Sequence, residues 1–355
     1  MSLALSAEQQ VTGKVKWKSP SNIAIVKYWG KHGQQLPRNA SLSLTLSAAH
    51  TITSVDYRSK EQHGEVSLDF LFEGQQNTAF ATKIEKFLAS LLGDMPFLGQ
   101  LHFDVASENS FPHSSGIASS ASAMSALALC LCSIEHDLFG TLPDVDSYIQ
   151  KASHLARLGS GSASRSVIPQ VGVWGSHAAV ASSSDLHAVG MDGVHDVFKT
   201  FHDDILIINA GEKAVSSRAG HALMEGNPYA TARYTQANDR LSQLTTIMKN
   251  GDVEQFGKLA EDEAMTLHAL MMCSDPSYVL MKPGTLAAIE VIRTYRKNTG
   301  HPVYFTLDAG PNIHLLYPDS IAAEVSQLIK EQLISYCQDG VVIRDIVGMG
   351  PEKLY

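Results

Sequence analysis

The sequence predicts a chain of two domains in which β-strands and α-helices are mixed. The chain has 355 residues, of which 44% are hydrophobic and 18% charged, and this is enough to build two cores. Its first half combines strand-like alternation with helical periodicity, whereas long helical stretches dominate its second half. The sequence character changes around residues 198–204. We therefore predict an N-terminal domain of residues 1–198 and a C-terminal domain of residues 199–355.

The first half begins with β-structure. Residues 41–46 alternate between polar and apolar side chains, as a half-buried strand does, and several other segments follow the same rule. Strands are expected over residues 13–18, 22–28, 41–46, 51–57, 65–71 and 101–106. Helices are expected over residues 82–92 and 118–136, where apolar residues recur with helical spacing.

The second half opens with a short apolar run over residues 205–210, which is typical of a central strand. Long helical patterns follow over residues 230–249, 253–271 and 284–299. A strand over residues 303–308 and a final helix–strand pair within residues 320–347 complete the prediction.

The net charge argues against a nucleic-acid partner, and the hydropathy pattern argues against a membrane span. A net charge of −9 argues against a nucleic-acid partner, which requires a clustered basic surface. Residues 1–10 lack the pattern of a signal peptide, and we expect no apolar run of the ~18 residues that a membrane span needs. These patterns favour a cytoplasmic protein.

The cysteines make no metal-binding or disulfide pattern. Cys130, Cys132, Cys273 and Cys337 include no C-x-x-C pair, and the first two point in different directions on an expected helix. We expect all four to be buried thiols.

A loop of small residues precedes the helix expected at 118–136. Gly116 allows close approach of the backbone to a ligand, the serine hydroxyls add donors, and the start of a helix favours an anion. The loop residues in question are Ser114, Ser115, Gly116, Ser119 and Ser120. The segment matches neither a P-loop nor a dinucleotide-binding turn, and a solvated loop with a helix cap explains it equally well.

Three further segments carry charge beside small residues. Lys27 and Lys31 flank two aromatic residues, Arg165 follows the glycine–serine run at 159–164, and Asp308 ends an expected strand. Singly, these are a solvated lysine pair, a flexible loop and a capping carboxylate. Together they supply phosphate donors, charge neutralisation and a carboxylate, which phosphoryl transfer to an alcohol requires.

At five places the chain resembles diphosphomevalonate decarboxylases of the GHMP kinase superfamily. The motifs lie at residues 19–31, 36–43, 108–120, 159–165 and 308–312, in family order and over nearly the whole chain. The resemblance implies an α+β fold of two domains with the active site in the cleft between them. It also implies ATP and Mg²⁺ as cofactors, decarboxylation of mevalonate 5-diphosphate to isopentenyl diphosphate after phosphorylation of its 3-hydroxyl, and a homodimer.

The resemblance also assigns roles to residues. It implies that Asp308 orients or deprotonates the hydroxyl, that Lys27 lies beside it, and that Arg165 holds the substrate carboxylate. Around the substrate it implies Asn22, Tyr28, Lys31, Ser160, Ser162 and one of Ser216 and Ser217. Around the nucleotide it implies Ser114, Ser115, Gly116, Ser119 and Ser120, with Ser120 on the metal.

The chain departs from the family pattern in the region of the expected diphosphate pocket. Residues 167–170 replace a common glycine pair, His32 stands where a second basic residue is common, and Arg38 where a small residue is usual. Three alternatives therefore stay open: a phosphomevalonate decarboxylase, a mevalonate-type kinase that stops after phosphorylation, and a non-catalytic sensor of a phosphorylated ligand.

Overall fold

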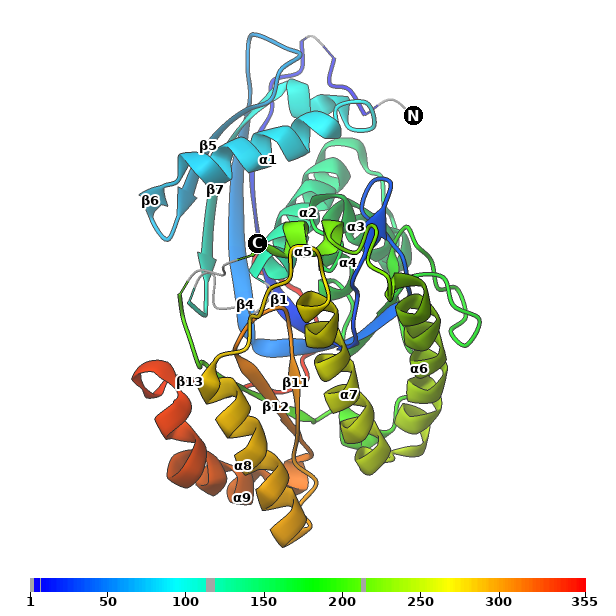
Figure 1. Ribbon diagram of the computed structural model, residues 1–355. Helices are drawn as coiled ribbons and strands as arrows, with labels where there is room; N and C mark the ends of the chain where they lie inside the picture. The colour runs from blue at the N-terminus through cyan, green and yellow to red at the C-terminus, as the bar shows by residue number, and fades with distance from the viewer. Residues whose placement is uncertain (1–2, 7, 113–118, 212–214) are drawn as a thin grey trace.

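The computed structural model describes residues 3–6, 8–112, 119–211 and 215–355, and it mixes helices and strands as the sequence predicts (Figure 1). Its described residues form two main sheets with helices packed against them. A separate short hairpin pairs β2 (Lys31–His32) with β3 (Leu36–Pro37).

The first sheet has eight strands. Their order is β14-β1-β4-β7-β5-β6, with β8 beside β4 and β9 beside β8. Its strands are β1 (Thr12–Val26), β4 (Ser41–Ser59), β5 (Ser67–Phe72), β6 (Gln75–Gln76), β7 (Leu101–Asn109), β8 (Val171–Trp174), β9 (Ala188–Gly190) and β14 (Glu352–Lys353). The pairs are antiparallel except for β5 with β7.

Two long strands replace four shorter predicted ones. β1 joins the strands expected at 13–18 and 22–28, and β4 joins those expected at 41–46 and 51–57. The register between β1 and β4 shifts between Pro20 and Asn22, where proline has no N–H to donate to the ladder. A local irregularity therefore accommodates this proline, at which the sequence predicts a break, and pairing continues to Val26.

The helices of the first half cover this sheet. They are α1 (Thr78–Ser90), α2 (Ser119–Phe139), α3 (Val145–Gly159) and the short α4 (Ala163–Ser166). α2 packs on β1 and β4. The expectation of no apolar run long enough for a membrane span is wrong for α2, which is long and apolar enough to cross a membrane by length and composition. However, 67% of its most apolar window is buried inside the fold, as in a core helix. The sequence missed α3, whose buried face includes Ser153 and Arg157, so that polar side chains interrupt its apolar pattern.

The second sheet has the order β11-β12-β10-β13 and is antiparallel. Its strands are β10 (His202–Leu206), β11 (Tyr304–Leu307), β12 (Ile313–Tyr317) and β13 (Val342–Ile343). The helices of the second half are α5 (Ser217–Ala222), α6 (Ala230–Asn250), α7 (Val253–Met272), α8 (Pro283–Thr299) and α9 (Ala322–Leu328). Of these, α7 and α8 contact β11 of this sheet. The sequence missed β12 because His314 interrupts its apolar run; the ring is buried and contacts the Asp203 carboxylate at 2.8 Å.

The two halves share a core. One apolar cluster joins Leu42 and Leu44 of β4 with Leu241 of α6 and Phe256 of α7. The end of the chain also returns to the first sheet, where β14 pairs with β1, and Figure 1 shows the C-terminus near the middle of the molecule. The end of β1 is therefore covered by helices of the second half. The boundary between residues 198 and 199 stays a prediction.

The cysteines follow the sequence expectation in three of four cases. Cys130, Cys132 and Cys337 are buried and form no disulfide. The prediction is wrong for Cys273, which is exposed because it follows the last helical residue of α7.

Candidate active site

Lys27 follows the last residue of β1 and is almost completely buried, with 1% of its surface exposed. Among the described residues, its Nζ atom has no hydrogen-bond partner. Burial lowers its pKa from 10.5 to about 8, against the opposing charges of Asp308 and Glu263. Lys27 is thus a buried ammonium group whose donors remain available to an anion.

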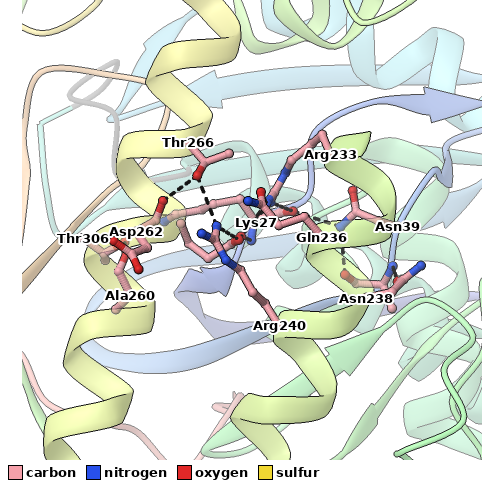
Figure 2. Close-up of polar contacts among 12 residues, drawn as sticks. Lys27, Asn39, Arg233, Gln236, Asn238, Arg240, Ala260, Asp262, Thr266 and Thr306 are labelled. Carbon is pink, nitrogen blue, oxygen red and sulfur yellow. Dashed lines mark hydrogen bonds and ion pairs between the residues drawn. The ribbon is translucent and has the colours of Figure 1, made fainter. Parts of the chain in front are cut away.

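The backbone of Lys27 is held from both sides. Its N–H donates to Glu263 Oε2 of α7 at 2.8 Å, while its carbonyl accepts from Asn39 Nδ2 at 3.0 Å and from Arg233 Nη2 at 3.3 Å. Figure 2 shows Lys27 beside Asn39, which precedes β4, and beside Arg233 and Arg240 of α6. Helices of the second half therefore fix the position of a lysine of the first half.

Glu263 is the centre of this support. The carboxylate is fully buried and pairs with both Nη atoms of Arg233 at 2.6 Å and with Arg240 Nη1 at 2.7 Å. Burial alone would raise its pKa, but the hydrogen bonds and charges of Arg233, followed by those of Arg240, lower it overall. Glu263 therefore stays ionised and can accept the Lys27 N–H.

Arg165 lies on α4 and is also buried, with 2% of its surface exposed. Its Nη1 donates to Ser41 Oγ at 2.6 Å, and its Nε donates to Ser43 Oγ at 3.1 Å and Asn22 Oδ1 at 3.3 Å. Burial lowers its pKa to about 10, opposed by the charge of Asp308. These neutral partners orient the guanidinium without cancelling its charge.

Asn22 ties α4 to β1. Its Nδ2 donates to the Ser162 carbonyl at 3.1 Å and to Ser166 Oγ at 2.8 Å, while its Oδ1 accepts from Arg165. The asparagine expected near the reacting centre is thus a buried support for the arginine.

Asp308 follows β11 and is half-buried. The turn after it is fixed through its carbonyl, which accepts from the Gly310 N–H at 2.7 Å and contacts His268 Nε2 at 3.1 Å. Its negative charge acts on Lys27 and Arg165. The structure thus brings Lys27 and Arg165 of the first half within electrostatic reach of Asp308 of the second half. These are the three charged residues that the sequence analysis grouped together.

Tyr28 and Lys31 lie beyond Lys27. The Tyr28 ring contacts Trp174, with centroids 4.7 Å apart, and burial raises the pKa of its hydroxyl. Among described residues, that hydroxyl has no hydrogen-bond partner. Lys31 is half-buried and donates to Gln35 Oε1 at 3.0 Å, and burial lowers its pKa. It lines a pocket with Arg38 and with residues 221–234 of the second half.

The two serine-rich segments approach each other. Ser120 is exposed near the start of α2, and its Oγ lies 3.3 Å from Ser160 Oγ; Ser119 and Ser162 are half-buried beside them. Ser114, Ser115 and Gly116 lie outside the described residues. Both Ser216 and Ser217 are exposed at the start of α5, where Ser216 Oγ accepts the Ala219 N–H at 3.2 Å and so caps that helix. Ser217 has no such capping role in the described structure, so it is the better candidate of the two.

Sequence reasoning missed three charged groups here. Glu263 is a carboxylate on a helix whose sequence does not distinguish it from a surface acid. Arg218 follows the serine pair directly and acts electrostatically on Lys31, so its position beside that motif could have found it. Arg157 is a buried guanidinium of α3 whose charge acts on Tyr28.

A cluster of side chains with the spacing of metal ligands lies outside the candidate active site. Among the described residues, one group of histidine and carboxylate side chains has this spacing: Asp69, His102 and Asp104, on β5 and β7. A metal at the candidate site would therefore depend on hydroxyls and on ligand phosphates more than on a preformed carboxylate cluster.

The fold and the site define the class of this protein. It is a mixed helix-and-sheet enzyme whose charged groups come from both halves and are arranged to hold an anionic small molecule. A model of the diphosphomevalonate decarboxylase-like N-terminal domain matches residues 19–185, and one of the mevalonate 5-diphosphate decarboxylase C-terminal domain matches residues 204–345. The chain belongs to the diphosphomevalonate decarboxylase family.

Known relatives agree with this assignment. The chain is 29% identical to the diphosphomevalonate decarboxylase of Schizosaccharomyces pombe over 83% of this chain and 76% of that one. It is 25% identical to the phosphomevalonate decarboxylase of Haloferax volcanii over 82% of this chain and 84% of that one. The solved structure of MDDEF in complex with MVAPP, AMPPCP and magnesium is similar with a TM-score of 0.80 and 28% identity, over 97% of this chain and 99% of that one.

Proposed function

We propose that this protein decarboxylates mevalonate 5-diphosphate in an ATP-dependent reaction that gives isopentenyl diphosphate. The observation that carries this proposal is the charge arrangement around Asp308. This carboxylate from the second half lies within the electrostatic reach of two buried cations of the first half, Lys27 and Arg165. A carboxylate beside an ammonium group suits an alcohol that must be deprotonated, and a buried guanidinium suits a substrate carboxylate.

The reaction has two chemical stages. First, the 3-hydroxyl oxygen attacks the γ-phosphorus of ATP, its proton passes to Asp308, and ADP leaves. The bond between C3 and the new phosphate then breaks, and inorganic phosphate leaves with its electron pair. The electrons of the bond to the carboxylate form the new double bond as carbon dioxide departs. Lys27 balances negative charge near the transferred phosphate, and Arg165 orients the carboxylate.

The ATP and Mg²⁺ of this proposal fit the described residues around Ser120. This hydroxyl is exposed, lies near the start of the long helix α2, and approaches Ser160 from another loop. A helix start favours phosphate, and Mg²⁺ prefers hydroxyl, phosphate and water oxygens. We infer that Ser119, Ser120 and the segment with Ser114, Ser115 and Gly116 hold the nucleotide phosphates, with Ser120 on the metal. The bound cation would neutralise phosphate charge.

The substrate phosphates are assigned to the pocket beside Lys31. We also assign the hydroxyls of Tyr28, Ser160, Ser162 and Ser217 to the substrate, and Arg218 adds a second positive charge that acts on Lys31. The proposal thus assigns the substrate phosphates to the pocket beside Lys31 and the nucleotide to the start of α2.

One assay separates this function from its alternatives. Purified protein with ATP and Mg²⁺ is given mevalonate, mevalonate 5-phosphate or mevalonate 5-diphosphate, and ADP and carbon dioxide are measured together. The proposal predicts equal amounts of both products with the diphosphate as the preferred substrate. Preference for the monophosphate would identify a phosphomevalonate decarboxylase, which one relative is. ADP without carbon dioxide would identify a kinase, and binding without turnover a sensor.

The proposal extends to organisation and location. We propose that residues 1–198 and 199–355 are the two domains, and that the protein acts as a homodimer in the cytoplasm on a small-molecule substrate. Light scattering after size exclusion tests the dimer, since a mass of one chain would contradict it.

Replacing Glu263 with glutamine should impair both folding and catalysis. The variant leaves Arg233 buried with a neutral partner, and breaking a buried ion pair costs about 3–5 kcal/mol. It also weakens the contact that holds Lys27, so we expect kcat to fall by ~10- to 100-fold. Urea unfolding and steady-state kinetics measure the two effects.

A matched control lies two residues away on α7. Glu261 is also buried and pairs with Arg296 Nη1 at 2.7 Å, but it has no described contact with Lys27. We expect Glu261→Gln to lose stability and to keep its kcat. If both variants reduce kcat equally, the support of Lys27 by Glu263 has no catalytic importance.

The activity should fall as the pH rises through the pKa of Lys27. Its folded pKa of about 8 lies below the ordinary value of 10.5, so the ammonium is lost near pH 8 in the free enzyme. We expect kcat/KM to decline with an apparent pKa near 8, and kcat to decline at higher pH because the bound anions favour the ammonium. Stability should change in the opposite sense, rising between pH 8 and 10.5, where the unfolded chain binds more protons.

The conservative variant tests this assignment. In Lys27→Arg the guanidinium stays charged, so the alkaline decline of kcat/KM should move beyond pH 10. A decline that remains near pH 8 in this variant, with its melting temperature preserved, would assign the titration to another group.

A further inference from the structure

His221 of α5 contacts the segment that follows Lys27 in the first half of the chain. Its ring lies against Tyr28 and Trp29, with centroid distances of 4.3 Å and 4.6 Å. Both aromatic residues follow Lys27 directly in the sequence. Two aromatic rings thus pack against the imidazole, whose polar contacts are made through its two ring nitrogens.

One edge of the ring is already used. Its Nδ1 accepts the N–H of Gly30 at 3.0 Å. Gly30 has a φ of +100°, and a Cβ atom there would lie 2.3 Å from the Tyr234 hydroxyl, so this turn requires glycine. Because Nδ1 is an acceptor, the neutral ring carries its proton on Nε2.

His221 remains neutral over the whole working pH range. Burial, reinforced by the positive charge of Lys31, lowers its pKa to about 3. The negative charge of Asp308 acts in the opposite direction and is outweighed. The residue is therefore a fixed neutral donor, not a titrating one.

His221 is one of the residues that line the pocket beside Lys31. The ring lines this pocket together with Lys31 and Arg38, and Nε2 is the polar atom that the Gly30 contact leaves available. Both Lys31 of the pocket and Asp308 of the reacting centre act on the ring electrostatically, so His221 is within electrostatic reach of each. A substrate that contacts both Lys31 and Asp308 would therefore bind near this ring.

We propose that His221 is a specificity-determining residue whose Nε2–H donates a hydrogen bond to a phosphate oxygen of the substrate. This inference rests on the proposed function and deepens it. A hydrogen bond to a charged acceptor is stronger than one to a neutral acceptor. A donor held by ring contacts and by the Gly30 N–H is already oriented before the ligand binds. Binding through this donor also requires no protonation of the ring.

Three variants separate the donor from the contacts that hold it. His221→Asn keeps a short side chain that can accept the Gly30 N–H but does not reach the pocket edge. His221→Phe keeps the ring contacts and removes both polar atoms. His221→Gln places an amide N–H near the position of Nε2. Melting temperatures identify any variant that fails to fold.

The measurements are the dissociation constants of inorganic pyrophosphate and mevalonate 5-diphosphate by calorimetry, together with kcat and KM. We expect the asparagine and phenylalanine variants to bind both ligands ~10- to 100-fold more weakly, with kcat within about threefold of the parent. The glutamine variant should recover most of the affinity.

The outcomes are distinct. Unchanged pyrophosphate affinity in His221→Asn and His221→Phe would overturn the inference. Equal losses in all three variants, including glutamine, would also overturn it and make His221 a structural contact of α5. If the parent protein binds pyrophosphate but releases no carbon dioxide from mevalonate 5-diphosphate, the proposed function fails, and the comparison of pyrophosphate affinities still decides the role of His221.

Discussion

Asp308→Asn is expected to lower kcat by about 10²- to 10⁴-fold while mevalonate 5-diphosphate still binds. The amide has nearly the same shape as the carboxylate, but it cannot take the proton of the 3-hydroxyl. The turn at this position is held through the backbone carbonyl of Asp308, so the substitution leaves those contacts in place. Steady-state release of carbon dioxide and calorimetric binding of the substrate measure the two parts of the prediction.

An aspartate outside the site provides the control. Asp319 follows β12 and pairs with His202 at 2.8 Å, and its side chain is 70% exposed. Asp319→Asn should keep the parent kcat. A rate within a few-fold of the parent in Asp308→Asn would remove this carboxylate from the reacting centre.

The second large effect is expected at Arg165. Arg165→Lys replaces a planar fork by a point charge, which cannot keep the contacts to Ser41 and Ser43 and also make two parallel bonds to a carboxylate. Loss of these charge-assisted bonds should lower kcat/KM for carbon dioxide release by about 10²-fold or more. The measurement is the rate of carbon dioxide release against substrate concentration.

Arg296→Lys is the matched control for this variant. Arg296 is another arginine held by buried side-chain contacts, here to the Glu261 carboxylate, but it lies on α8 outside the site. It should lose stability and keep kcat/KM. Near-parent activity in Arg165→Lys would mean that the site needs only a positive charge at this position.

The sequence predicted the fold where local patterns are strong. The helices α6, α7 and α8 follow their predicted ranges within one or two residues, because their apolar spacing and glycine or proline limits are clear in the chain. It failed where polar groups are buried with tertiary partners. His314 in β12 and Arg157 in α3 look like interruptions in the sequence, and only the folded chain supplies Asp203 and the carbonyl of Leu186 to satisfy them.

The same contrast holds for the site. The sequence and its family resemblance indicated Lys27, Arg165 and Asp308, and the structure brings these residues together. The sequence could not indicate the residues that hold these three side chains in position. Glu263 lies 236 residues from Lys27 in the chain, and its partners become visible only when α7 packs over the end of β1. The tautomer of His221 likewise depends on the fold, through a turn at Gly30.

The central claim is that the 3-hydroxyl oxygen becomes part of a phosphate before carbon dioxide leaves. Mevalonate 5-diphosphate with a heavy oxygen isotope in its 3-hydroxyl group, turned over with ATP and Mg²⁺, tests this claim directly. We predict that mass spectrometry finds the label in the released inorganic phosphate, because the bond that breaks is the one between C3 and that oxygen. Label released as water, with unlabelled inorganic phosphate, would contradict the account, since the hydroxyl would then leave without having been phosphorylated.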